Sequence, residues 1–205
     1  MDFLLFTIRS LPGEMIMSEK NALAILGSPR INGMTAAMMD QAVAAAGRAG
    51  YAVTTIHLYE KELSFCTGCR ICMDTKICVQ KDDIQEIAEL LGKCRLVILA
   101  APVYWANVPA AVKNLFDRLL GTALEETNGF PKPRLRGKKY MILTSCNTPA
   151  PFSWIFGQSR GAIRNMEEFF KLAGMRPKGR IVCANAKHRE ELPKRTVKKI
   201  ERCLK

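Results

Sequence analysis

Short apolar runs and segments with apolar residues at helical spacing alternate along the chain from about residue 20 onward. The apolar runs predict five β-strands, at 22–26, 52–58, 96–100, 140–144 and 180–183. The helical spacing predicts a helix after each strand, at 38–49, 84–91, 112–119, 163–173 and 197–204. This alternation is typical of an α/β doubly wound parallel sheet with helices on both faces, a three-layer arrangement.

The loop after the first strand has the residues of an anion site. Its sequence, GSPRINGMT at 27–35, ends a strand at a Gly/Pro turn and opens a helix, whose first backbone N–H groups lack partners within the helix. Ser28, Asn32 and Thr35 add side-chain donors, and Arg30 adds a positive charge. We interpret the loop as a monophosphate site. It has neither the dinucleotide spacing G-x-G-x-x-G nor the Gly-Lys-Ser/Thr of a triphosphate loop, and the alternative is an ordinary polar turn.

The loop after the third strand is rich in aromatic residues. Tyr104 and Trp105 offer flat apolar surface, and the backbone around Pro102 and Val103 can hydrogen-bond a ring edge. In a doubly wound sheet this loop, the phosphate loop and the turn after the fourth strand meet outside the carboxyl ends of the strands. A phosphate site beside a planar-ring site predicts flavin mononucleotide (FMN). The alternative is a hydrophobic lid or a subunit contact.

Four of the eight cysteines form a second candidate site, Cys66-x-x-Cys69-x-x-Cys72-x5-Cys78. Four thiolates at this spacing can bind one [4Fe–4S] cluster, although the last spacing differs from that of bacterial ferredoxins. Zinc usually joins two separated C-x-x-C pairs, so zinc fits less well, and thiols without metal are the other alternative. No catalytic side-chain constellation is evident, and the cofactors would supply the chemistry.

Length and composition favour one domain. We expect a loosely ordered extension at 1–16, a folded domain at 17–205, and a cysteine-rich loop at 64–80. Apolar runs stay well short of the about 18 residues of a membrane span, and the clustered cysteines without a secretory leader predict a cytoplasmic protein. Residues 130–205 hold 19 Lys and Arg against 5 Asp and Glu. This basic half is either a solvated face or a docking surface for an acidic partner, and nucleic-acid binding is not expected without interleaved aromatic residues.

The motifs together resemble the NAD(P)H-dependent FMN reductase-like flavoproteins. The likeness includes the 27–35 loop, the cysteine loop ending in Lys81-Asp82-Asp83, and Pro102 to Trp105 leading to Lys113, Asn114, Asp117 and Arg118. More narrowly, the chain resembles the iron-sulfur flavoproteins of anaerobic microbes. The resemblance implies a flavodoxin-like fold with strand order 2-1-3-4-5 and a tightly bound FMN.

The resemblance also implies roles for individual residues. The phosphate would be held by Ser28, Arg30, Asn32, Gly33, Met34 and Thr35. The flavin ring would be flanked by Pro102, Val103, Tyr104 and Trp105, with Asn107 and Ser145 as further candidates on the third and fourth loops. The cluster would be ligated by Cys66, Cys69, Cys72 and Cys78.

The implied function is an oxidoreductase that passes electrons between a reduced donor, the cluster and FMN. The donor would be ferredoxin-like or NAD(P)H, and the protein a homodimer or homotetramer. One alternative is a cluster-independent NAD(P)H-dependent FMN or quinone reductase. The second alternative is a non-catalytic basic binding module on the same scaffold, because a fold does not fix a function.

Overall fold

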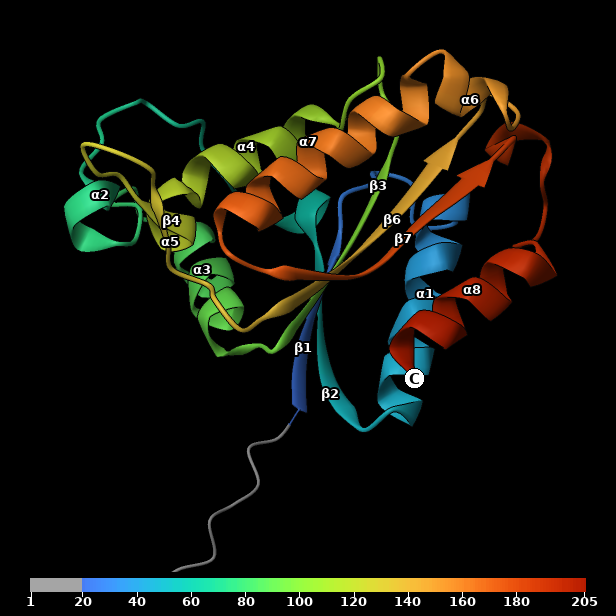
Figure 1. The fold of residues 1–205 in the computed structure, drawn as a ribbon, viewed down its shortest axis with the longest axis horizontal. Coiled ribbons are helices and arrows are strands. Elements are labelled where there is room, and N and C mark those ends of the chain that lie inside the picture. The colour runs from blue at the N-terminus through green and yellow to red at the C-terminus, as the bar shows by residue number, and fades with distance from the viewer. Residues whose placement is uncertain (1–19) are drawn as a thin grey trace, which may run out of the picture.

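Five strands form one parallel sheet in the computed structural model, which describes residues 20–205 (Figure 1). Their order in space is β2-β1-β3-β6-β7, and every neighbouring pair runs parallel. This confirms the predicted strand order 2-1-3-4-5. The strands are β1 Lys20–Leu26, β2 Tyr51–His57, β3 Leu96–Pro102, β6 Lys139–Cys146 and β7 Arg176–Ala184.

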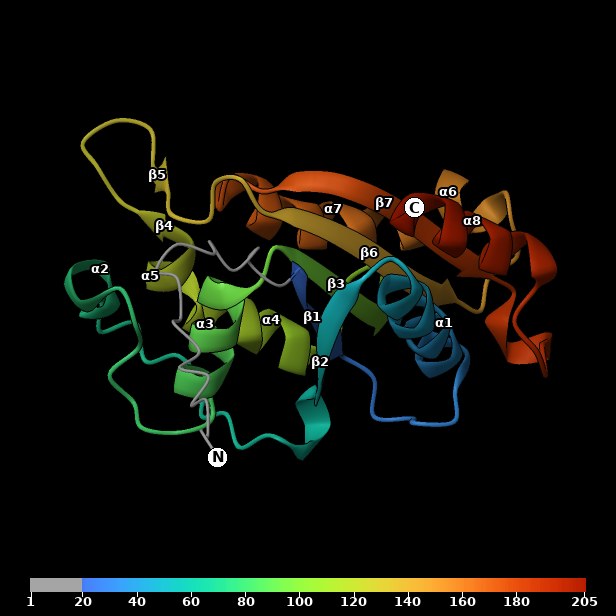
Figure 2. The ribbon, with the colours of Figure 1, turned by 90° about the horizontal axis from the view of Figure 1, so that it is seen from below.

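Helices cover both faces of the sheet, as Figures 1 and 2 show. One layer holds α1 (Met34–Arg48) and α8 (Lys194–Leu204), and the other holds α3 (Ile84–Lys93), α4 (Ala110–Arg118) and α7 (Gln158–Leu172). The connections contain short elements: η1 Leu58–Glu60, α2 Cys72–Thr75, α5 Leu120–Ala123, α6 Phe152–Ile155, η2 Ala186–His188, β4 Leu124–Glu125 and β5 Lys132–Pro133.

Two hydrophobic cores result from the alternation of side chains along each strand. In β1, Leu23 and Ile25 pack toward α3, α4 and α7, whereas Ala22, Ala24 and Leu26 pack toward α1 and α8. Both sets are buried, so the strand is apolar throughout, as a parallel strand covered on both faces should be. The sheet is therefore a rigid base for the loops at its carboxyl edge.

The fifth strand is longer than the predicted 180–183, and Pro177 lies within it. β7 is at the edge of the sheet, where a missing N–H need not break the hydrogen-bond ladder. The register shifts between Tyr140 and Met141, whose partners are Pro177 and Gly179, so Lys178 is an extra residue at this irregularity.

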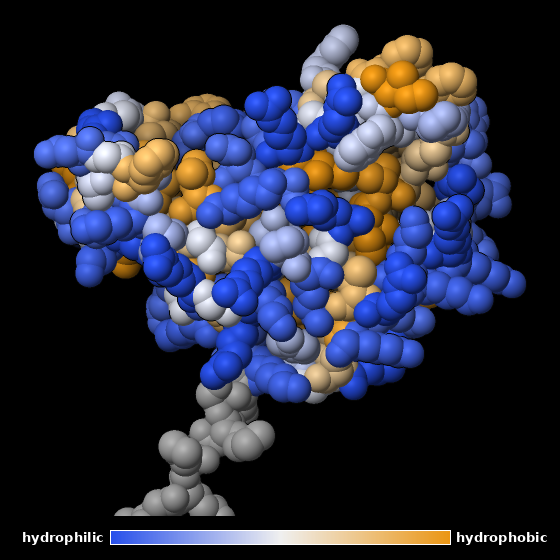
Figure 3. Space-filling view, viewed as in Figure 1, coloured by the Kyte–Doolittle hydropathy of each residue, from blue (hydrophilic) through white to orange (hydrophobic). Residues whose placement is uncertain are grey.

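Two connections contain structure that hydrophobic periodicity does not reveal. The connection between α5 and β6 includes the small antiparallel pair β4–β5. Residues between Pro149 and Gln158 include α6, and this segment exposes the large side chains Phe152, Trp154, Ile155 and Phe156. In Figure 3 hydrophobic side chains gather on the surface over this part of the molecule. Short helices of four residues carry too little periodic signal for prediction.

The predicted extension at 1–16 and the start of the domain at residue 17 lie outside the described residues. Among residues 20–205, helices are too short or too polar to cross a lipid bilayer. Cys94 and Cys183 are buried in the core, and burial raises the pKa of the Cys94 thiol to about 11. These two thiols are therefore core side chains.

Candidate functional site

The loop after β1 begins with a close approach of two backbones. The Gly27 N–H donates to the Ala100 carbonyl oxygen at 2.8 Å, and a Cβ atom at Gly27 would overlap the Val112 side chain of α4. Glycine is therefore required where the chain leaves the sheet. Ser28 is buried, and its Oγ accepts a hydrogen bond from the Arg30 N–H at 3.2 Å, which fixes the turn that follows.

The helix α1 begins without a side-chain cap. Its N-cap residue, Gly33, has no side chain, so the N–H groups of the first turn face the loop rather than a capping oxygen. The positive end of the helix dipole lies at the same place, and no acidic residue occupies the first turn. This end of α1 is consequently suited to an anion.

A buried hydrogen bond joins the first turn of α1 to the end of β6. The Thr35 and Ser145 hydroxyl oxygens are 2.7 Å apart, and both side chains are buried. The Val103 N–H donates to the Ser145 carbonyl oxygen at 2.9 Å, which ties the loop after β3 to the same place. These contacts hold together the loops that adjoin these elements, which follow β1, β3 and β6, in one rim at the carboxyl edge of the sheet.

These loops line a cavity of about 480 Å³, which lies within the usual range of ligand sites. The lining includes the following predicted residues: Ser28, Arg30, Asn32, Gly33, Met34, Thr35, Pro102, Val103, Tyr104 and Ser145. The structure therefore brings the phosphate-loop candidates and the ring-loop candidates into a single cavity. We call this space the carboxyl-edge cavity.

Trp105 and Asn107 are not among the lining residues. Tyr104 and Asn107 exchange two backbone hydrogen bonds, of 2.8 and 2.9 Å, around a tight turn. The turn holds Trp105 and Ala106 at φ angles of 52° and 58°, and the Trp105 side chain is fully exposed. The Asn107 carbonyl Oδ1 accepts from the Val108 N–H at 2.8 Å, so this side chain supports its own loop.

Asn147 also lines the cavity, as expected for the turn after the fourth predicted strand. Another part of the wall was not anticipated from the sequence: the segment after β7 contributes Ala186, Lys187, Arg189 and Glu190. Since β7 runs parallel to the other strands, its carboxyl end lies at the same edge, and this topology was the available signal. Lys187 and Arg189 join Arg30 in giving the wall three cationic side chains against the single carboxylate of Glu190.

The cysteine loop projects beyond the sheet near α2 and α5 (Figure 1). Cys66 and Cys69 are exposed, Cys72 and Cys78 are half-buried, and all four are free thiols. Burial raises the pKa of the Cys72 thiol; a hydrogen bond from the Gly121 backbone opposes this rise, and the thiols of Cys78, Cys66 and Cys69 add to it. Within residues 20–205, however, three or more metal-ligating side chains do not converge on one point.

Arg118 of α4 holds the two ends of the cysteine loop together. Its guanidinium is buried and donates to the Ser64 carbonyl at 2.5 Å and to the Gln80 carbonyl at 3.4 Å. Its Nε–H donates to Cys78 Sγ at 3.3 Å, and Asp82 pairs with the same guanidinium. Burial alone would raise the pKa of Asp82, but hydrogen bonds from Arg118 and from the backbone of Ser64 and Ile84 outweigh it, and the pKa is lowered.

Comparison with known proteins identifies relatives across the described chain. Residues 20–205 match the Flavodoxin_2 family model, which describes a flavodoxin-like fold. An iron-sulfur flavoprotein of Archaeoglobus fulgidus is 38% identical over 117 residues, which are 57% of this chain and 50% of that protein. An iron-sulfur flavoprotein of Methanocaldococcus jannaschii is 31% identical over 160 residues, 76% of this chain and 73% of that protein.

A solved structure has the same fold at low sequence identity. The FMN-dependent NADH-azoreductase of Bacillus anthracis, in complex with FMN, superimposes with a TM-score of 0.70 and 11% identity, covering 90% of this chain and 97% of the other. At that identity the likeness concerns the fold alone. The alignment with the Archaeoglobus relative spans about half of that protein's length. From the family match and the second relative, the chain belongs to the Flavodoxin_2 family and is a relative of the iron-sulfur flavoproteins.

Proposed function

We propose that this protein is an FMN-binding oxidoreductase that passes electrons between a reduced donor, a [4Fe–4S] cluster on the cysteine loop, and FMN. The observation that carries the proposal is the convergence of the loops after β1, β3 and β6 on the carboxyl-edge cavity. The relatives named iron-sulfur flavoprotein support both cofactors. The FMN complex of the azoreductase with the same fold supports the flavin.

The chemistry of the cavity fits a flavin phosphate. The uncapped end of α1, the Ser28 and Thr35 hydroxyls and the Arg30 guanidinium would hold the phosphate, because these groups donate hydrogen bonds or carry positive charge. Lys187 and Arg189 would add to the positive potential around it. Asn32, Gly33 and Met34 complete this part of the wall.

The loop after β3 would position the flavin ring. Pro102, Val103 and Tyr104 line the cavity and offer apolar surface, and the hydrogen bond from Val103 to Ser145 holds this loop in place. Trp105 and Asn107 lie on the adjoining turn, and a direct contact with the ring remains a prediction for both. When bound, FMN supplies one- and two-electron transfer, and an iron-sulfur cluster supplies one-electron transfer.

The cysteine loop offers the type of ligand that an iron-sulfur cluster requires, since it carries four thiols on one short segment. Cys66, Cys69, Cys72 and Cys78 would be the ligands. Arg118 would place a positive charge and an N–H donor beside the Cys78 sulfur, and hydrogen bonds to cluster sulfurs tune the reduction potential.

Cofactor analysis of anaerobically purified protein tests the proposal directly. We expect about one FMN and roughly four iron and four acid-labile sulfide per chain, with a flavin absorption spectrum. Well-folded protein that is colourless and does not bind added FMN would overturn the whole proposal. Stoichiometric zinc, or iron-free thiols after anaerobic reconstitution, would overturn the cluster alone and leave the flavin assignment intact.

A second candidate is a cluster-independent NAD(P)H-dependent FMN or quinone reductase. One observation favours it, namely that the four cysteines do not gather as a metal site within the described residues. Anaerobic stopped-flow spectroscopy separates the candidates. Rapid bleaching of bound flavin by NAD(P)H alone supports the reductase, whereas reduction only by a ferredoxin supports the electron relay.

We also propose an acidic, ferredoxin-like donor protein. The exposed basic side chains of α8 support it: Lys194, Arg195, Lys198, Lys199 and Arg202. Donor turnover should then slow as ionic strength rises, because exposed charges are screened, while FMN content stays constant. A rate that does not change with salt contradicts this docking mode.

The exposed aromatic side chains of α6 and Trp105 support a homodimer or homotetramer, which light scattering would test.

A further inference from the structure

Two of the four cysteines of the loop are held by the short chain segment that joins α4 to α5. Arg118, the last residue of α4, donates from Nε to Cys78 Sγ at 3.3 Å. Within α5, the backbone N–H of Gly121 donates to the sulfur of Cys72. We call residues 118–121 the α4–α5 connection. It supplies one hydrogen-bond donor to each of two candidate ligand sulfurs.

Gly121 can approach Cys72 only because it has no side chain. The residue is buried, and a Cβ atom placed on it would lie 2.1 Å from the Cys72 carbonyl oxygen and 2.8 Å from the Cys72 Cβ. Both distances are well inside van der Waals contact, so any larger residue would push α2 away from α5. Glycine at this position therefore fixes where Cys72 lies.

Arg134 fastens α2 and α5 to each other. Its guanidinium donates from Nη1 to the Gly121 carbonyl at 2.5 Å and from Nη2 to the Met73 carbonyl at 3.1 Å. The Thr122 hydroxyl also donates to the Lys76 carbonyl at 3.0 Å. Because these bonds reach both ends of α2, this short helix is fixed against α5.

Cys78 is held from two sides. Gln85 of α3 donates from Nε2 to the Cys78 carbonyl oxygen at 2.9 Å, and Arg118 of α4 donates to the Cys78 sulfur. The Arg118 side chain is completely buried, and its ion pair with Asp82 keeps the guanidinium in place. Both the backbone and the side chain of Cys78 are therefore anchored to the body of the domain.

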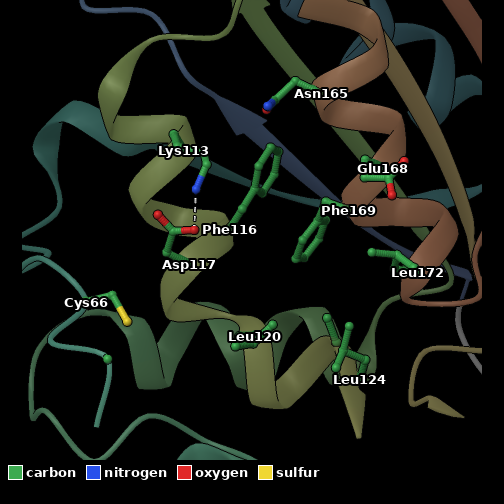
Figure 4. Close-up of a pocket in the computed structure, with 12 residues that line it drawn as sticks. Cys66, Lys113, Phe116, Asp117, Leu120, Leu124, Asn165, Glu168, Phe169 and Leu172 are labelled. Atoms are coloured by element: carbon green, nitrogen blue, oxygen red, sulfur yellow. Dashed lines mark hydrogen bonds and ion pairs between the residues drawn. The ribbon is translucent and has the colours of Figure 1, made fainter. Parts of the chain in front are cut away.

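Cys66 and Cys69 have no comparable anchors among the residues that the structure describes. Both are exposed, and no hydrogen bond from another described residue reaches their sulfurs. Gly68 and Arg70, beside Cys69, adopt φ angles of 69° and 63° in a segment without helix or strand. Cys66 lies beside α4 and borders the same pocket as Leu120 of α5, so it is close to the α4–α5 connection (Figure 4). Since the four thiols do not converge on one point within the described chain, this exposed pair is the part that must move.

We propose that the fold itself builds one half of the cluster site, with the α4–α5 connection holding Cys72 and Cys78 in position, and that Cys66 and Cys69 move to complete the ligand set. We call Cys72 and Cys78 the anchored pair. Gly121 is then a positioning residue for a cluster that it does not ligate. Hydrogen bonds from surrounding residues orient the ligands of metal sites in the same way. The inference rests on the cluster of the proposed function and adds which ligands the fold sets in advance.

Alkylation of the iron-free, full-length protein tests the anchored pair separately from any cluster. Iodoacetamide, followed by mass spectrometry, should modify Cys66 and Cys69 about tenfold faster than Cys72 and Cys78, because exposed thiols react more readily than half-buried, anchored ones. Equal rates at all four cysteines would overturn the anchored pair.

Gly121→Ala tests the close approach. The new methyl group should displace α2, so the alkylation rate of Cys72 should rise several-fold, and the protein should lose roughly half or more of the iron that it takes up on anaerobic reconstitution. FMN content should stay constant and report on folding, because α2 and α5 do not line the carboxyl-edge cavity. The matched control is Gly129→Ala between β4 and β5, where a Cβ atom meets nothing within 4 Å, and it should match the wild-type protein in all three measurements.

Wild-type iron content in Gly121→Ala, or an unchanged alkylation rate at Cys72, would overturn the inference. If Gly121→Ala also loses FMN, Arg134→Met is judged by the same criteria, because it removes both bonds between α2 and α5 from a partly exposed side chain. Wild-type protein that takes up no iron would instead overturn the cluster of the proposed function, and the alkylation rates would still test whether Cys72 and Cys78 are anchored.

Discussion

Arg118 and Asp82 form a two-point ion pair beneath the cysteine loop. Arg118 Nη1 donates to Asp82 Oδ2 at 2.8 Å, and Nη2 donates to Oδ1 at 2.9 Å. The arginine side chain is completely inaccessible to solvent and that of Asp82 is 11% exposed. This geometry fixes the chain just after Cys78 against α4. The ends of the loop therefore depend on a buried charge pair as well as on hydrophobic contacts.

Removing the guanidinium should destabilise the protein strongly. Arg118→Leu leaves the Asp82 carboxylate and the Ser64 carbonyl without their partner, and we expect a loss of about 3–5 kcal/mol in the free energy of unfolding. Arg70→Ala, which breaks the exposed pair Arg70–Glu126, should cost about 0–1 kcal/mol. Urea unfolding followed by circular dichroism measures both. Equal midpoints for the two variants would contradict a structural role for Arg118.

The Arg118–Asp82 ion pair also predicts how the stability of the protein depends on pH. The pKa of Asp82 is lower in the folded protein than its ordinary value of 3.8, so folding favours the ionised form. The resulting stabilisation is complete well above pH 3.8 and is lost as the pH falls from there through the folded pKa. Asp82→Asn should therefore lower stability at pH 6 and narrow the difference in unfolding free energy between pH 6 and pH 3. A difference as large as in the wild-type protein would contradict this linkage.

Much of the site could be predicted because its signals are local. The loop after β1 combines a strand end, a Gly/Pro turn and polar side chains within nine residues, and the aromatic loop directly follows β3. The segment from Ala184 to His188 contains no glycine or proline, so its place in the cavity follows only from the parallel topology. Sequence periodicity does assign β7 itself, but it underestimates a strand that includes Pro177 at the sheet edge.

Long-range contacts explain the rest of what the sequence did not reveal. Arg118 reaches Asp82 and Ser64, which lie 36 and 54 residues earlier in the chain. An arginine in the last turn of an amphipathic helix would ordinarily be read as solvated, because Lys and Arg are rarely buried unless paired. Only the packing of α4 against the cysteine loop shows that this arginine is internal.

Alanine variants of Gly27 and Gly47 form a matched pair that tests the close backbone approach after β1; Gly47, within α1, is the control. In Gly27→Ala the new methyl group overlaps the Val112 side chain, so we expect a loss of about 1–3 kcal/mol and weaker FMN binding as α4 shifts. In Gly47→Ala the methyl group meets no atom within 4 Å, and alanine favours the helix α1 by about 0.5–1 kcal/mol. The midpoint temperature of thermal unfolding should fall in Gly27→Ala and rise in Gly47→Ala. A stabilised Gly27→Ala would contradict the close approach.

Arg30 should distinguish FMN from riboflavin. If the guanidinium contacts the phosphate, Arg30→Ala should raise the dissociation constant for FMN about tenfold, whereas that for riboflavin, which lacks the phosphate, should stay unchanged. Fluorescence titration of the flavin-free protein measures both constants. Arg202→Ala on α8 is the control, because it removes an exposed positive charge from a residue that does not line the cavity. Equal losses for FMN and riboflavin would place Arg30 elsewhere than at the phosphate.

The four cysteines of the loop should behave as a set. Replacing any one of Cys66, Cys69, Cys72 or Cys78 by serine removes a thiolate ligand, so each variant should lose most of the iron and sulfide that the reconstituted protein holds. FMN content should stay at the wild-type level, because these residues do not line the carboxyl-edge cavity. Cys203→Ser on α8 is the matched control and should retain iron. Full iron content in any of the four loop variants would remove that residue from the ligand set, and loss in Cys203→Ser would show that the iron is not specific to the loop.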